Sequence, residues 1–278
     1  MRNTRNILTL ALAGFALAAC DDISGSDFDG APGATLSFAV APATSTANTI
    51  WQGSRQAGVI LTDAAGRTLE VTQLQVVMED VELERQFDDD CNDVDACEKF
   101  EIGPVLIDLP VNGGVITPFD VPIPSDTYDE LELEIDDASD DSTSAQFFTD
   151  HPTWPQDASI RIVGTFDAND GAGPQPFDVY LEIEAEIERE LVPPLVITDS
   201  AQTVNVTVEV DVAAWFQDAF GLIDPRELAT NDDMVDALED RIEETFDAFE
   251  DDDRDGDDSD DDGSDDDDGT TDQGSGDN

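Results

Sequence analysis

The sequence contains little positive charge. Only 11 lysine and arginine residues stand against 68 aspartate and glutamate residues, which gives a formal net charge of −57. Nucleic-acid binding requires a basic surface that meets phosphates, so this composition excludes it. Direct docking on anionic lipid headgroups is disfavoured for the same reason. The partners that remain are cations, basic proteins and neutral glycans.

Histidine is also scarce, because His151 is the only one. No serine or cysteine lies in a recognisable nucleophile motif, so a Ser-His-Asp triad is not expected. The sequence has no His-Glu-x-x-His, Walker or dinucleotide-binding motif either. With 68 acidic residues, a pair of carboxylates says nothing about catalysis. We therefore predict no catalytic residue and expect a non-enzymatic protein.

The first 19 residues have the pattern of an export signal. Arg2 and Arg5 precede an apolar run of about 13 residues that ends in small side chains. A membrane-spanning helix needs about 20 apolar residues, so a retained transmembrane anchor is disfavoured. The final tetrapeptide, Leu17-Ala18-Ala19-Cys20, resembles the bacterial lipobox. An ordinary secretory signal with a chance cysteine is the alternative.

The lipobox resemblance implies cleavage before Cys20 and fatty acylation of that residue, which anchors a protein stably when several chains are attached. We therefore expect a signal peptide over 1–19, a flexible tether over 20–33, and an exported protein anchored to a membrane of the bacterial cell envelope. The sequence leaves open which membrane this is, and whether the protein faces the periplasm or the outside.

Two further cysteines, Cys91 and Cys97, lie close together in the chain. In an oxidising compartment such a pair predicts a disulfide. A bond closing this short loop would contribute about 2 kcal/mol in the chain-entropy model. Zinc would require further cysteine or histidine ligands nearby, and the sequence has none there.

Several segments alternate apolar and polar residues with period two, which is typical of strands with one buried face. The clearest are 131–135, 160–162, 177–187 and 204–212. Further strands are expected near 34–41, 57–62, 68–86, 103–109 and 115–121. In 68–86 the alternation slips between Met78 and Val81, which predicts a β-bulge or bend. We predict an all-β protein, an antiparallel β-sandwich over 34–224 with a C-terminal amphipathic helix and a disordered acidic tail.

Four short segments within this region resemble a family of bacterial lipoprotein domains of unknown function. They are Val76–Leu83, Val105–Leu109, Ile123–Tyr128 and Val206–Val212. Members of that family have an immunoglobulin- or transthyretin-like sandwich behind a lipobox. The resemblance implies this fold and implies no activity.

A C-terminal helix is predicted within 225–250, most clearly from Asn231 to Glu250. Asn231 can cap it, and one apolar stripe follows helical spacing: Val235, Leu238, Ile242, Phe246 and Phe249. The stripe either docks on the sandwich or recruits a partner. Upstream, Trp215, Phe216 and Phe220 are interpreted as a short buried helix, and Asp224-Pro225 as a cap with proline in the first turn.

Residues 251–278 hold 15 aspartates and one arginine, and we expect them to be disordered unless cations order them. Asp251, Asp253 and Asp255, followed by Gly256, match the start of a calcium loop, with Asp262 at its twelfth position. No second helix follows, so an open aspartate repeat fits better than an EF-hand. Weak, unspecific cation binding is the alternative, and Ca²⁺ is the only cofactor that the sequence indicates.

Loop 137–156 carries His151 together with Phe147, Phe148 and Trp154. Long loops in compact domains are often functional. These aromatic residues could bind a sugar or a protein partner, or they could plug the open end of the sandwich.

A second indication of cations comes from the predicted strands. Outward-facing glutamates, namely Glu132, Glu134, Glu182, Glu184, Glu186 and Glu209, have few basic neighbours available. Like charges on adjacent strands repel one another, so salt or calcium should stabilise the fold. The leading hypothesis is a lipid-anchored, non-enzymatic binding or structural module. The alternatives are a calcium-dependent adhesion or assembly module that uses the tail, and a glycan-binding or glycan-active protein that uses loop 137–156.

Overall fold

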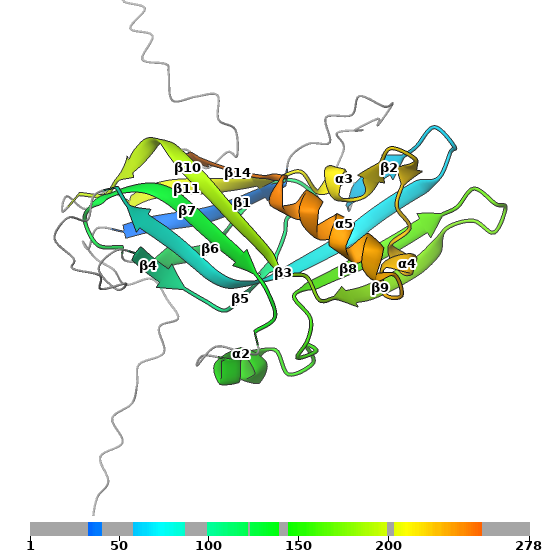
Figure 1. Cartoon of the computed structure of the whole chain (residues 1–278), viewed down its shortest axis with the longest axis horizontal. Coiled ribbons are helices and arrows are strands. Elements are labelled where there is room, and N and C mark those ends of the chain that lie inside the picture. Colours follow the sequence, from blue (N-terminus) through cyan, green and yellow to red (C-terminus); the bar gives the residue numbers. More distant parts are fainter. Residues whose placement is uncertain are drawn as a thin grey trace, which may run out of the picture.

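The computed structural model describes residues 33–40, 58–86, 99–121, 123–138, 144–198 and 203–251. Strands dominate this part of the chain and form two main sheets, which lie over each other at one end of the molecule (Figure 1). The predicted all-β, sandwich-like fold is therefore confirmed. Among the described residues, no helix has the length and apolar character needed to cross a membrane.

The smaller sheet contains four strands in the order β14-β11-β1-β6. Their bounds are β1 (Gly33–Val40), β6 (Val115–Val121), β11 (Thr203–Val210) and β14 (Phe246–Glu250). β1 and β11 run parallel, with Leu36 opposite Val206. All other strand pairs of the described residues are antiparallel.

The larger sheet is organised along one long strand, β3 (Thr68–Arg85). One edge of β3 pairs in turn with β2 (Val59–Thr62), β5 (Val105–Asp108) and β4 (Lys99–Ile102). The other edge pairs first with β8 (Ile160–Asp167) and then with β7 (Thr127–Ile135). β9 (Gln175–Leu181) adds to β8, and β10 (Ala185–Val196) adds to β7. The sheet thus has two halves that share β3.

Each half of the larger sheet is covered by a different layer (Figure 1). β7, β10 and the end of β3 lie over the smaller sheet. Helices cover the half formed by β2, β8 and β9: α3 (Val212–Trp215), α4 (Pro225–Leu228) and α5 (Asp232–Glu243). Trp215, Leu238 and Ile242 belong to the same apolar core as the strands. One continuous core therefore runs under both halves.

The register of β3 has three irregularities, and two of them keep its apolar side chains on the core face. One lies between Val71 and Gln73, and the other between Met78 and Asp80. The second is the bulge that the sequence predicts. Gly103 stands against it, because a Cβ atom on Gly103 would lie 1.6 Å from the carbonyl oxygen of Glu79. Glycine is thus required where the two backbones approach so closely.

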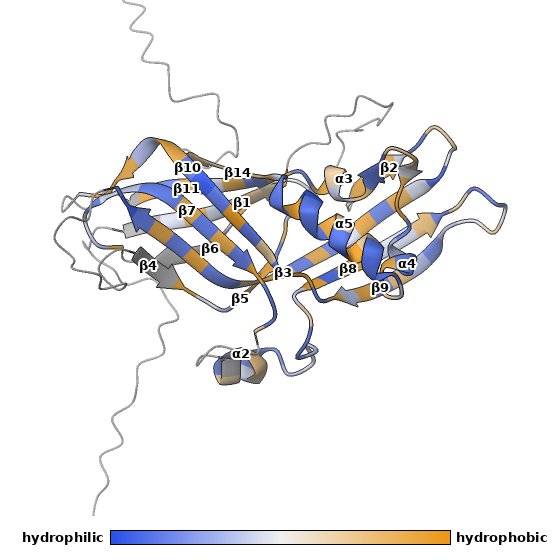
Figure 2. Ribbon diagram, in the orientation of Figure 1, coloured by the Kyte–Doolittle hydropathy of each residue, from blue (hydrophilic) through white to orange (hydrophobic). Residues whose placement is uncertain are grey.

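The alternation of side chains is visible along β3, β7 and β10 as bands of hydrophobic and hydrophilic residues (Figure 2). On β7, Leu131, Leu133 and Ile135 are almost fully buried, whereas the acidic residues between them are only half-buried. The predicted strand over 177–187 is divided, since residues 182–184 separate β9 from β10. β4 and β14 were not predicted.

The C-terminal helix is shorter than the sequence indicates. α5 ends at Glu243, and Phe246–Glu250 form strand β14, which pairs with β11. Phe246 still reaches the core, and Leu238 and Ile242 dock there as well. The stripe therefore packs on the sandwich, as one of the two interpretations expected. Residues 246–250 belong to the sandwich rather than to a helix over 225–250.

The region before α5 matches the predictions in part. Asp224 caps α4 through its carboxylate, which accepts a hydrogen bond from the backbone N–H of Arg226, and Pro225 occupies the first turn. Asn231 lies at the N-cap of α5 but makes no side-chain cap bond. Trp215 and Phe216 are buried, whereas the prediction for Phe220 is wrong. Phe220 lies in the turn between β12 (Gln217–Asp218) and β13 (Gly221–Leu222) and is 92% exposed.

Tyr128, at the start of β7, connects this strand to the preceding turn by a hydrogen bond. Its side chain is fully buried, and its hydroxyl donates a hydrogen bond of 2.9 Å to the carbonyl oxygen of Pro124. A tyrosine bonded to the backbone a few residues upstream is a feature of Greek-key sandwiches. The bond fixes how β7 enters the sheet.

Replacing Tyr128 by phenylalanine should lower the free energy of unfolding by about 1–3 kcal/mol, because the Pro124 carbonyl loses its donor. Urea denaturation measures this change. Tyr180→Phe is the matched control, since the Tyr180 hydroxyl has no hydrogen-bond partner among the described residues. Equal stability of Tyr128→Phe and the unmodified protein would show that the hydrogen bond from Tyr128 to Pro124 contributes nothing.

Candidate functional site

The outer face of β3, β7 and β10 carries three rows of carboxylates. The register places Glu134 between Asp80 and Glu186, Glu132 between Glu82 and Glu188, and Glu130 between Glu84 and Glu190. Every neighbour along a row carries a like charge. Because adjacent strands lie only about 4.8 Å apart, these charges repel one another. We call these nine residues the acidic rows.

The rows follow directly from the alternation of the three strands. Each strand sends its apolar residues to the core, as Val81 and Leu83 do on β3, and acids occupy the positions between them. The bulge at Glu79 matters because it restores this phase after Met78. Without it, Asp80, Glu82 and Glu84 would turn toward the core.

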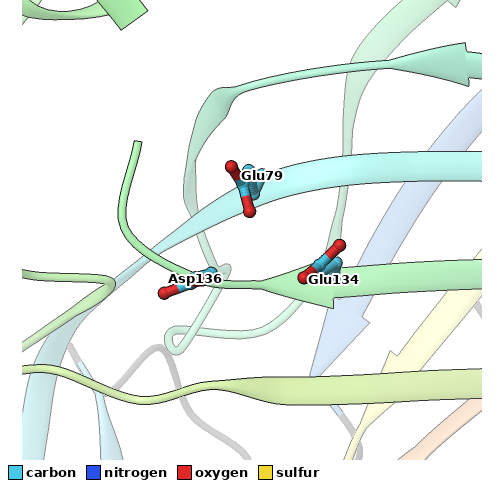
Figure 3. Close-up of side chains that lie close together, drawn as sticks. All are labelled: Glu79, Glu134 and Asp136. Atoms are coloured by element: carbon cyan, nitrogen blue, oxygen red, sulfur yellow. The ribbon is translucent and has the colours of Figure 1, made fainter. Parts of the chain in front are cut away.

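At one end of the rows, the bulge brings three acids into a group. Glu79 comes from β3, Glu134 from β7, and Asp136 follows directly after β7 (Figure 3). One carboxylate oxygen from each lies within 4.8 Å of the others, and all three residues are half-buried. Oxygens at such spacing can share one hard cation, because calcium binds oxygen at about 2.4 Å.

A second group lies inside the rows. Glu82, Glu84 and Glu132 also have carboxylate oxygens within 4.8 Å of one another. Glu82 is only 6% exposed despite its place on the outer face. These two groups are the places among the described residues where side chains could hold a metal ion.

Crowding of the carboxylates changes their proton affinity. Burial, followed by the charges of Glu134 and Asp136, raises the pKa of Glu79 to about 7. Burial, followed by the charges of Glu82 and Glu186, raises the pKa of Glu132 to about 7. The pKa values of Glu130 and Glu134 are raised as well, first by burial and then by the neighbouring acids. The face therefore favours protons or cations near neutral pH.

Four of the six arginines of the described residues pair with acids outside the rows, and Arg241 donates to the backbone carbonyl of Ala237. Arg67 binds Asp63, Arg85 binds Asp126, Arg161 binds Asp178, and Arg226 binds Asp224. Arg189, although it lies on β10, donates to the backbone carbonyls of Glu243 and Phe246. The single lysine, Lys99, stands opposite Glu84 in register, at the edge of the rows.

Of the predicted calcium residues, Asp251 lies among the described residues, and it is not part of the acidic rows. Asp251 lies just after β14, where it is 3% exposed and its carboxylate accepts a 2.7 Å hydrogen bond from Thr207. It belongs to a buried polar network with Asn205. Asp253, Asp255 and Asp262 lie outside the described residues, as do Cys20, Cys91 and Cys97.

The aromatic residues of loop 137–156 form a small second core. Helix α2 (Ser144–Asp150) and the segment after it bury Phe147 and Trp154 against Val77, on the outer face of β3. The Trp154 indole N–H donates to the carbonyl of Ala158. Phe148 and His151 are half-buried, and the His151 ring lies 4.9 Å from that of Phe147. The structure thus uses Phe147 and Trp154 for packing against the sheet rather than at the open end of the sandwich.

Comparison of the chain with protein families, with curated proteins and with solved structures found no match.

Sequence reasoning identified part of the acidic face. Glu132, Glu134 and Glu186 were expected to face outward, and they lie in the rows. Glu182 and Glu184 lie between β9 and β10, and Glu209 lies in the other sheet. The three acids of β3 and the bulge residue Glu79 were missed, and so were Glu130, Glu188 and Glu190. The alternating acids in Glu79–Glu84 indicate an acidic strand face. Which residues lie beside them depends on the order of the strands in the sheet, and the sequence pattern does not give that order.

The raised pKa values predict how stability changes with pH. Glu79 and Glu132 bind protons more tightly in the folded chain than in the unfolded chain, where the pKa is the ordinary 4.5. The stability they contribute is fully present below about pH 4.5 and is lost as pH rises through about 7. At low salt, melting temperature should therefore fall between pH 5 and pH 8.

Replacing Glu132 by glutamine should raise the melting temperature at pH 8 by several degrees and flatten its fall above pH 5. Glu182→Gln is the matched control, because it removes one charge at an exposed position outside the rows. Thermal melts at four pH values measure both variants. A Glu132→Gln variant that behaves like the control at every pH would contradict the role assigned to the rows.

Proposed function

We propose that the protein is a lipid-anchored module of the bacterial cell envelope with a non-enzymatic binding or structural role, and that cations stabilise it. The observation that carries the cation part is the acidic face of β3, β7 and β10, where nine carboxylates stand in register. Protons, Na⁺ or Ca²⁺ can relieve their repulsion. The anchor is supported by the lipobox-like tetrapeptide ending in Cys20.

A structural or binding role agrees with the positions of the acidic residues and of the single histidine. The acids are distributed over one face of a sheet, whereas general acid-base catalysis needs a few groups placed around one reacting atom. His151 packs beside Phe147 rather than beside a nucleophile. The rows suit many weakly held counterions, and the two groups around Glu79 and Glu82 suit more specific binding of a divalent ion.

The glycan hypothesis receives less support from loop 137–156. A sugar-binding platform needs an aromatic ring that is open to solvent, but Trp154 is 8% exposed and Phe147 is 5% exposed. The acidic face therefore supports the proposed function, and the aromatic residues of loop 137–156 have a packing role. A basic protein partner remains compatible with the same face.

Salt should stabilise the protein markedly. The Debye length falls from about 10 Å at 0.1 M to about 3 Å at 1 M salt, so repulsion between adjacent strands is screened only at the higher concentration. Thermal melts in NaCl at pH 8 should show a rising melting temperature. CaCl₂ at equal ionic strength should raise it further if the groups around Glu79 and Glu82 hold the ion.

The combined variant Glu130→Gln, Glu132→Gln and Glu134→Gln removes the middle strand's charges from all three rows. It should be more stable than the unmodified protein at low salt and less responsive to NaCl. A control with the same change in net charge carries Glu182→Gln, Glu227→Gln and Glu244→Gln at dispersed exposed positions. An unmodified protein that melts at one temperature in all salts would refute the proposal.

A further inference from the structure

The described residues expose three large hydrophobic side chains, and two of them belong to strand β10. Val192 is 84% exposed and Val196 is 55% exposed. Both belong to the last part of β10, where the register with β7 shifts between Glu190 and Leu195. Pro193 is also exposed, whereas Leu191 and Leu195 are buried and hold the segment in the core. We call Val192, Pro193 and Val196 the apolar bulge.

The apolar bulge lies at the end of the molecule where the N-terminal segment enters the fold. Val196 stands opposite Thr127, and the next strand, β11, begins at Thr203 directly opposite Gly33. Gly33 is the first residue of β1. Figure 1 shows the start of β1, the start of β11 and the end of β10 at the same end of the sandwich.

The length of the preceding chain limits how far this end can stand from an anchor at Cys20. Residues 21–32 separate Cys20 from β1. A flexible linker of this length has an end-to-end distance of about 20 Å. A lipid on Cys20 would therefore keep the apolar bulge within reach of the bilayer surface.

The third exposed hydrophobic residue marks the opposite end. The carbonyl oxygen of Phe220 accepts a hydrogen bond from Arg67, which directly precedes β3. The apolar bulge lies near Arg85, at the other end of β3, because Arg85 stands opposite Tyr128 and Tyr128 stands opposite Leu195. A strand of 18 residues spans on the order of 55 Å. Phe220 therefore provides a reference position far from the apolar bulge.

We infer that the apolar bulge contacts the lipid bilayer to which Cys20 is anchored, so that the sandwich stands with this end on the membrane. The inference rests on the proposed lipid anchor. Two valines and a proline bind lipid weakly by themselves, but the tether supplies a high local concentration of membrane. Asp126, Asp129 and Glu190 flank the bulge, so the surface it fits is zwitterionic rather than anionic.

The test uses the full-length, lipidated protein in phosphatidylcholine vesicles with brominated acyl chains, which quench tryptophan at the membrane. Val192→Trp is compared with Phe220→Trp, and the unmodified protein supplies the baseline of its native tryptophans. Added fluorescence at position 192 should be quenched severalfold more strongly than that at position 220. Replacing half the lipid with phosphatidylglycerol should weaken the quenching at 192.

Flotation of the vesicles and the mass of the N-terminal peptide are measured in parallel. If the protein floats and Cys20 is acylated but position 192 is quenched no more than position 220, the orientation is wrong and the anchor stands. If Cys20 carries no acyl mass and the protein does not float, the proposed anchor is wrong, and the membrane contact is overturned with it.

Discussion

The acidic face exists because β3 keeps one side toward the core along its whole length. Its bulge at Glu79 restores the alternation after Met78, so that Val81 and Leu83 turn inward and the acids between them turn outward. Burial of the apolar side chains is worth about 1.5–3 kcal/mol for each residue. This gain holds the strands together despite the repulsion of like charges on their other side. The same hydrophobic register that folds the chain therefore concentrates its negative charge.

Because negative charge is concentrated on one face, the stability of the protein depends on the pH and the salt around it. Protonation, screening or a bound cation each relieve the repulsion among the rows, and this repulsion adds to burial in raising the pKa values of Glu79 and Glu132. Arg161, by contrast, is fully engaged with Asp178 and lowers the pKa of that carboxyl. In the exported protein that we propose, the acidic face is in contact with the ions outside the cytoplasm.

The sequence predicts most strands because period two depends only on local alternation, as in 204–212 and 131–135. It also predicts the bulge after Met78, where that alternation fails. The end of α5 was misplaced because Phe246 fits both a helical stripe and a strand, and only the pairing with β11 decides between them. The acidic rows could be foreseen in part, since Glu132 and Glu134 had to face outward. Their meeting with Glu82 and Glu188 depends on strand order, which local patterns do not encode.

The proton affinity of the acidic face can be measured directly by carbon-13 NMR titration of the glutamate carboxyl groups at low salt, with Glu79→Gln and Glu132→Gln used to assign the two signals. We expect titration midpoints of about 7 for both residues, and a fall of these midpoints when NaCl or CaCl₂ is added. Midpoints at the ordinary glutamate value of 4.5, unaffected by salt, would contradict the role assigned to the acidic face.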